Sequence, residues 1–186
     1  MKEIVWVYGP SASGKERLIQ FLLSKDGKVL REKLGWNNKK VISCEESVTH
    51  IAQFDEDPAY EQRKRIPELV SALTKNYDII LIKGQFVDFE ANYPRLLREK
   101  HPEALHRIIF LNLDLEELTQ RLVQKKWWSG QHDAIAYSKG EIEILGKQLS
   151  NLGDEFEITH LDSSKNGSYK FLNIQVPSED SSTTTR

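Results

Sequence analysis

Glycine and lysine residues near the start of the chain have the spacing of an anion-binding turn. Gly9 and Gly14 enclose four residues, and Lys15 follows the second glycine directly. An apolar run precedes this turn and a helical pattern follows it, which is the context that a phosphate-binding loop requires. Glycines permit the backbone angles and the close approach that such a turn needs. Successive N–H groups and the positive end of the following helix then attract phosphate oxygens.

This loop is therefore predicted to bind a nucleoside triphosphate, because a lysine at this position reaches the β- and γ-phosphates. An ordinary glycine-rich turn is the alternative interpretation. The predicted nucleotide-binding residues of this segment are Gly9, Pro10, Ser11, Ala12, Ser13, Gly14, Lys15, Glu16 and Arg17.

Glu16 departs from the usual pattern, in which a Ser or Thr hydroxyl after the lysine ligates Mg²⁺. Three alternatives stay open. The metal is held by phosphates, water and another carboxylate, or Glu16 is itself the ligand, or catalysis is impaired. If no metal absorbs its charge, Glu16 repels the triphosphate and must be offset by Arg17 or another cation.

The elements that must position the loop alternate along the chain. Strand-sized apolar runs are separated by helical patterns, which favours right-handed βαβ crossovers and a parallel sheet. Asp114 and Glu117 resemble a capping box at the start of one helix. The expected strands are residues 2–8, 41–44, 77–83, 107–113 and 155–161, and the clearest helices begin near 15, 67 and 115 and precede 155.

The bulk composition excludes several classes of protein. The chain has 186 residues, 39% of them hydrophobic, and a net charge of −2, so it is neither fibrous nor strongly basic. No apolar run is long enough to cross a bilayer, and no signal peptide is recognised. One cysteine, Cys44, excludes an internal disulfide and a cysteine zinc site, and it favours a cytoplasmic setting. We expect one domain over residues 1–176 and a disordered tail over 177–186.

Several segments together resemble the P-loop nucleoside and nucleotide kinase-like group of small phosphotransferases. They are the Walker A loop at 9–15, Arg-Ile-Ile-Phe-Leu-Asn-Leu-Asp at 107–114, Leu118 with Arg121, and residues 157–164. The resemblance implies a three-layer α/β/α sandwich around a five-stranded parallel sheet. It also implies transfer of the γ-phosphoryl group of ATP, with Mg²⁺, to an acceptor hydroxyl or phosphate.

The resemblance also assigns roles in catalysis. The second strand of such folds faces the acceptor, so Glu45 or Glu46 would take the acceptor's proton. The alternative is that both acids only stabilise a helix N-terminus. Arg121 would neutralise charge on the transferring group at the start of a lid over about 125–140. Its alternative is a solvated basic helix end.

Binding roles follow in the same way. The last strand leads to the adenine-side residues Asp162, Ser163 and Ser164, or to a simple turn. Residues after the third strand lack the carboxylate of a Walker B motif. The acceptor-side candidates are Gly84, Gln85, Asp88 and Arg63, although the basic cluster 63–65 also reads as a solvated helix face.

The sequence thus favours an ATP-dependent kinase acting on a small-molecule or nucleotide acceptor. A nucleotide-binding regulatory protein with little turnover is the first alternative, and the absent hydroxyl at position 16 favours it. A kinase of polynucleotide ends that uses Arg63, Lys64 and Arg65 is the second. A membrane partner is not expected, and a nucleic-acid partner is disfavoured by the charge balance.

Overall fold

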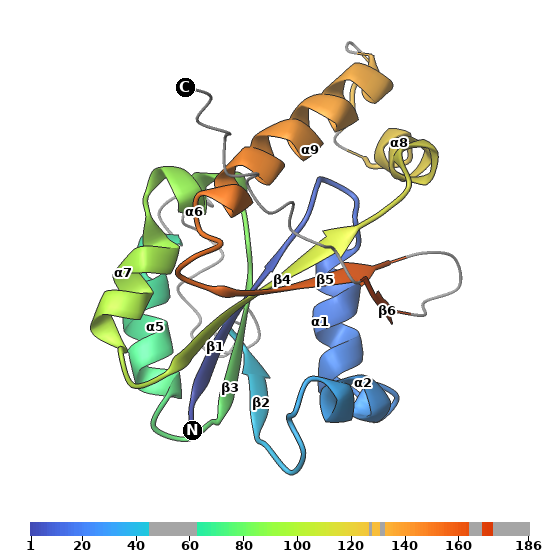
Figure 1. Cartoon of the computed structure of the whole chain (residues 1–186). Coiled ribbons are helices and arrows are strands. Elements are labelled where there is room, and N and C mark those ends of the chain that lie inside the picture. Colours follow the sequence, from blue (N-terminus) through green and yellow to red (C-terminus); the bar gives the residue numbers. More distant parts are fainter. Residues whose placement is uncertain (45–62, 127, 131–132, 164–168, 173–186) are drawn as a thin grey trace, which may run out of the picture.

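The fold is built on one mixed sheet whose strands lie in the order β2-β3-β1-β4-β5-β6 (Figure 1). The computed structural model describes residues 1–44, 63–126, 128–130, 133–163 and 169–172, apart from the side chains of residues 86 and 87. All neighbouring strands pair in parallel except β5 and β6. The strands are β1 (Glu3–Tyr8), β2 (Val41–Ser43), β3 (Ile79–Lys83), β4 (Leu105–Asn112), β5 (Glu157–Asp162) and β6 (Lys170–Phe171).

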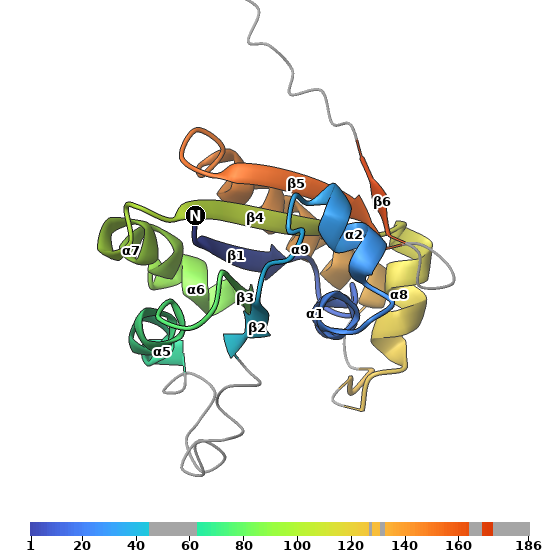
Figure 2. The same cartoon turned by 90° about the horizontal axis from the view of Figure 1, so that it is seen from below.

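Helices cover both faces of the sheet, which makes three layers. Figure 2 shows α5, α6 and α7 on one side of the strands and α1 and α2 on the other. Burial on both faces explains why the central strands read as continuous apolar runs rather than as alternating patterns. The helices are α1 (Lys15–Leu23), α2 (Lys28–Lys33), α5 (Ile66–Leu73), α6 (Phe86–Glu90), α7 (Tyr93–Lys100), α8 (Leu115–Val123) and α9 (Ala134–Ser150).

Each face of the sheet has its own hydrophobic core. On one face Trp6 and Ile82 pack with residues of α5, α7 and the C-terminal half of α9. On the other face Val7 and Leu81 pack with α1 and α2. Alternate residues of one strand therefore serve opposite cores, and the two cores together fix the direction in which β1 enters the phosphate loop.

The predicted α/β sandwich is confirmed, with one correction to the sheet. The sequence predicted five parallel strands, whereas the structure adds β6 as a sixth, antiparallel strand at the edge. This strand has only two residues, which is too short for a periodic pattern. Asp114 caps α8 as expected, since its Oδ1 accepts from the N–H groups of Glu116 and Glu117. The carboxylate of Glu117 instead accepts from Arg121.

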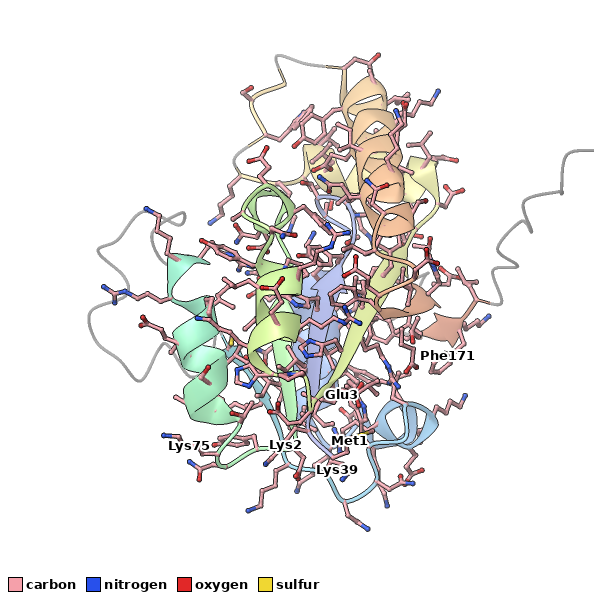
Figure 3. The ribbon with its side chains drawn as sticks, turned by 60° about the vertical axis from the view of Figure 1, so that its left-hand side comes forward. Met1, Lys2, Glu3, Lys39, Lys75 and Phe171 are labelled. Atoms are coloured by element: carbon pink, nitrogen blue, oxygen red, sulfur yellow. The ribbon has the colours of Figure 1, made fainter. Side chains whose placement is uncertain are left out.

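The amino ends of the parallel strands form the end of the molecule opposite the phosphate loop, which we call the opposite pole. Figure 3 shows Lys2, Glu3, Lys39 and Lys75 together at this lower end of the molecule. Glu3 is buried there and accepts a hydrogen bond of 2.9 Å from the indole of Trp36. Among the described residues, no helix combines the length and the apolar character that a membrane span needs.

Candidate functional site

The phosphate loop follows β1 and leads into α1 at the carboxyl edge of the sheet, below α9 in Figure 1. Three of its residues have positive φ: Gly9 at 154°, Ala12 at 63° and Gly14 at 94°. A Cβ on Gly9 would lie 2.6 Å from Oγ of Ser13 and 3.0 Å from the carbonyl oxygen of Leu111. Glycine is therefore required at position 9 both by conformation and by the close approach of β4.

The side chain of Lys15 folds back over the loop. Its Nζ donates to the carbonyl oxygens of Gly9 at 2.7 Å and Pro10 at 3.0 Å. Burial lowers the pKa of Lys15 to about 8, helped by the charges of Lys83 and Lys125 and opposed by Glu141. The ammonium thus lies over the loop in an environment that destabilises its charge, and a bound phosphate would stabilise that charge.

A carboxylate from α9 reaches the loop across the sequence. The backbone N–H of Ser11 donates to Oε2 of Glu141 at 2.8 Å, and the Ser11 hydroxyl donates to Oε1 at 2.7 Å. Glu141 also accepts a long hydrogen bond from the hydroxyl of Tyr137. One amide of the predicted anion-binding loop is therefore already bonded to an anionic group of the chain itself.

The end of β5 braces the other side of the loop. The buried hydroxyl of Ser163 donates to the carbonyl oxygen of Ser13 at 3.0 Å, and its N–H donates to the carbonyl of Asn112. Arg121 of α8 bonds to Glu117 at 2.5 Å and reaches the carbonyl of Ser163 at 3.4 Å. Ser163 and Arg121, both predicted site residues, thus lie next to the loop, while Asp162 ends β5.

Glu16 and Lys83 form an ion pair beside the loop. Nζ of Lys83, the last residue of β3, lies 3.8 Å from Oε2 of Glu16 in the first turn of α1. The side chain of Glu16 is 78% exposed and that of Lys83 is 31% exposed. Arg17 is exposed. Among the residues that the structure describes, the cation paired with Glu16 is Lys83, which the sequence did not single out.

Arg63 and Asp88 form a buried ion pair behind the loop that follows β3. Both oxygens of Asp88 accept from Arg63, and Oδ2 also accepts from the N–H of Gln85 at 2.7 Å. Arg63 further donates to the carbonyl oxygen of Lys83 at 2.9 Å. Burial raises the pKa of Asp88, and Arg63 opposes that shift. The pair therefore fixes the backbone of residues 83–88, as a salt bridge with additional hydrogen bonds can.

This burial corrects one expectation for the basic cluster at residues 63–65. Lys64 and Arg65 are exposed, as expected for a solvated helix face, but Arg63 is 5% exposed. The sequence missed this because the partner, Asp88, lies 25 residues further along the chain. Both residues were predicted to bind the acceptor, and the structure shows that their charged groups bind each other.

The described residues do not fit the usual magnesium site of a P-loop. In such sites the metal is held by a loop hydroxyl and a carboxylate at a strand end. Here Glu16 takes the place of the hydroxyl and Lys83 takes the place at the strand end. Within the described ranges no three His, Cys, Asp or Glu residues lie together as a metal-binding group.

Some predicted residues lie outside the described part of the chain. Glu45, Glu46 and Ser164 are among them, as is the predicted tail over 177–186. Cys44, directly before the two glutamates, is buried at the end of β2. Because β2 neighbours β3, this end of the strand adjoins the loop that carries Gly84 and Gln85. The proposed base and the proposed acceptor residues thus follow adjacent strands.

Comparisons with known proteins identify the fold. No family model matches the sequence, and no curated protein matches it. The structure is similar to a shikimate kinase from Acinetobacter baumannii, with a TM-score of 0.52 and 13% identity over 90% of this chain and 87% of that one. It is also similar to a chain of the PezAT toxin–antitoxin system of Streptococcus pneumoniae, with a TM-score of 0.53 and 14% identity over 91% and 70%. A gluconokinase from Sinorhizobium meliloti matches with a TM-score of 0.43 and 17% identity over 89% and 84%. The similarity to the shikimate kinase shows that the chain has a P-loop kinase-like fold.

Proposed function

We propose that this chain binds ATP at the phosphate loop and transfers its γ-phosphoryl group to a small-molecule or nucleotide acceptor. The observation that carries the proposal is the position of Lys15, whose ammonium lies over a loop between β1 and the N-terminus of α1. This arrangement supplies a positive charge and the dipole of the α1 N-terminus to one polyphosphate. The kinase-like fold supports the same reaction class.

In this proposal the loop amides and Lys15 bind the β- and γ-phosphates, and Arg121 stabilises charge on the transferring group. An acceptor oxygen attacks the γ-phosphorus, the bond to the bridging oxygen breaks, and ADP leaves. Glu45 or Glu46 receives the proton of an acceptor hydroxyl. The ion pair of Glu117 with Arg121 holds the guanidinium near the loop and supports its role.

On the acceptor side, the loop after β3 would present Gly84 and Gln85 to the substrate, as ligands bind at the carboxyl ends of strands in open sheets. Arg63 and Asp88 would then act by positioning this loop, since their charges are already paired. A cytoplasmic location belongs to the same proposal and is supported by the presence of a single cysteine, Cys44, which is buried.

A regulatory nucleotide-binding protein with little turnover is the second candidate. Two observations favour it: the Glu16–Lys83 pair at the usual metal position and the bond of Glu141 to the loop. The third possibility, a kinase of polynucleotide ends, loses support because Arg63 is buried against Asp88.

The decisive experiment measures formation of ADP from ATP across nucleosides, nucleotides, sugars and oligonucleotides, with and without Mg²⁺. An acceptor-dependent rate that disappears in Lys15→Ala would support the kinase. ATP binding without any acceptor-dependent rate would favour the regulatory protein. Absence of both binding and turnover would refute the proposal.

A further inference from the structure

The two positions that hold Mg²⁺ in other P-loop proteins carry opposite charges in this chain. A hydroxyl and a carboxylate oxygen are the expected ligands, and both are oxygen donors that suit a hard dication. Glu16 and Lys83 instead place an ammonium 3.8 Å from a carboxylate. A dication in the same place would be repelled by the Lys83 charge, which offsets the attraction of the Glu16 carboxylate.

The backbone holds Lys83 firmly at this point. It pairs with Val7 in the parallel register of β1 and β3, two residues before Gly9. The next residue, Gly84, donates from its N–H to the carbonyl of Val7 at 2.9 Å. Arg63 donates to the carbonyl of Lys83 from the buried pair with Asp88. The position of this residue is therefore set by strand pairing and by the buried ion pair together.

The ion pair between Lys83 and Glu16, in contrast, is weak. The distance between the two charged groups is long, and the carboxylate is largely exposed, so solvent screens most of the attraction. The charge of Lys83 nevertheless reaches the loop, since it helps to lower the pKa of Lys15. A polyphosphate bound to the loop would attract both ammonium groups and remove their mutual repulsion.

We infer that Lys83 supplies at this site the positive charge that Mg²⁺ supplies in other P-loop proteins, so that the chain binds the metal-free triphosphate. Glu16 orients the ammonium when no nucleotide is bound and releases it to the phosphates when one binds. The inference rests on the proposed binding of nucleotide at the loop, and it specifies the ionic form of the nucleotide that binds there.

The test is calorimetric titration of the full chain with ATP, once in excess EDTA and once in excess Mg²⁺. We expect the dissociation constant in EDTA to be equal to that in Mg²⁺, within about threefold, or tighter. Affinity that is weaker in EDTA by more than that would overturn the inference and leave nucleotide binding intact. No binding in either buffer would refute nucleotide binding itself.

Substitutions make the test specific to Lys83. Lys83→Met keeps an unbranched side chain and removes the charge, so ATP affinity in EDTA should fall by about 10-fold, as for loss of one charge-assisted hydrogen bond. Lys75→Met, at the opposite pole in Figure 3, is the matched control and should bind like the parent chain. Equal affinity of Lys83→Met and the parent chain in EDTA would contradict the inference.

A second variant restores the usual ligands. Glu16→Ser combined with Lys83→Asp supplies a hydroxyl and a carboxylate, so ATP binding should come to depend on Mg²⁺. Binding that stays independent of Mg²⁺ in this variant would count against the role of Lys83. Circular dichroism melting checks that each variant is folded. If a variant is not folded, the dissociation constants of the parent chain in EDTA and in Mg²⁺ still test the inference.

Discussion

Replacing Glu141 with alanine should increase the affinity for ATP, because its carboxylate is bonded to the loop that the phosphates must enter. Two hydrogen bonds, of 2.8 and 2.7 Å, join Glu141 to the amide and hydroxyl of Ser11. Hydrogen bonds to a charged group contribute about 1.5–3 kcal/mol each when buried. Since this site is partly exposed, we assign about 1.5–3 kcal/mol to the two together.

That energy sets the fraction of molecules in which Ser11 is not bonded to Glu141. A bias of about 1.5–3 kcal/mol leaves roughly 1–10% of molecules with Ser11 free, and the apparent dissociation constant rises by the inverse of that fraction. Glu141→Ala should therefore tighten ATP binding by about 10- to 100-fold. The pKa of Lys15 is about 8, and removal of Glu141 lowers this pKa further. Calorimetry is therefore done at about pH 6, where Lys15 is protonated in both proteins.

Glu143→Ala is the matched control for this prediction. Glu143 lies on the same helix, is exposed and pairs with Lys147. Its substitution removes the same charge from α9 without touching the loop, so the affinity for ATP should stay unchanged. If Glu141→Ala bound ATP as well as or less tightly than the parent chain, competition between the carboxylate and the phosphates would be refuted.

Three further outcomes follow from contacts at and near the loop. The affinity for ATP should fall as the pH rises through about 8, because Lys15 of the unliganded protein loses its proton there. The Lys15→Met variant should lack this fall. The stability of the unliganded protein should change in the opposite direction, since burial of the Lys15 charge costs stability below about 8 and the cost disappears toward 10.5. Gly84→Ala should destabilise the fold by about 1–3 kcal/mol in urea denaturation, because its Cβ would lie 2.2 Å from the ring of Tyr8, which stacks on Trp6 and Phe89. Gly146→Ala, which meets nothing within 4 Å, is its control, and equal stability of the two variants would show that the Tyr8 ring yields.

The sequence predicted the parts of the fold that follow from local patterns. The loop at 9–15, the cap at Asp114 and the apolar strands each occupy one continuous segment, and the structure places them where expected. Four elements, α2, α6, α7 and β6, were not predicted. Of these, α2 has six residues, α6 has five and β6 has two, and segments this short carry no readable period.

The site was less predictable, because its partners are far apart in sequence. Glu141 lies 130 residues from Ser11, and the apolar pattern of α9 does not indicate which loop its polar residues contact, so no local signal pointed to this contact. For Lys83 the sequence did show the missing carboxylate at the end of β3, but not that its ammonium pairs with Glu16. The tertiary fold decides such pairs, and spacing along the chain does not encode them.

The measurement that bears most directly on nucleotide binding at the loop is titration of ATP into the parent chain and into Lys15→Ala, in EDTA and in Mg²⁺. Lys15 is bonded to the carbonyls of Gly9 and Pro10, and the proposed function makes it a ligand of the phosphates. We expect Lys15→Ala to weaken ATP binding by about 1.5–3 kcal/mol, which is roughly a 10- to 150-fold change in the dissociation constant. Equal affinity of the two proteins in both buffers would contradict nucleotide binding at this loop.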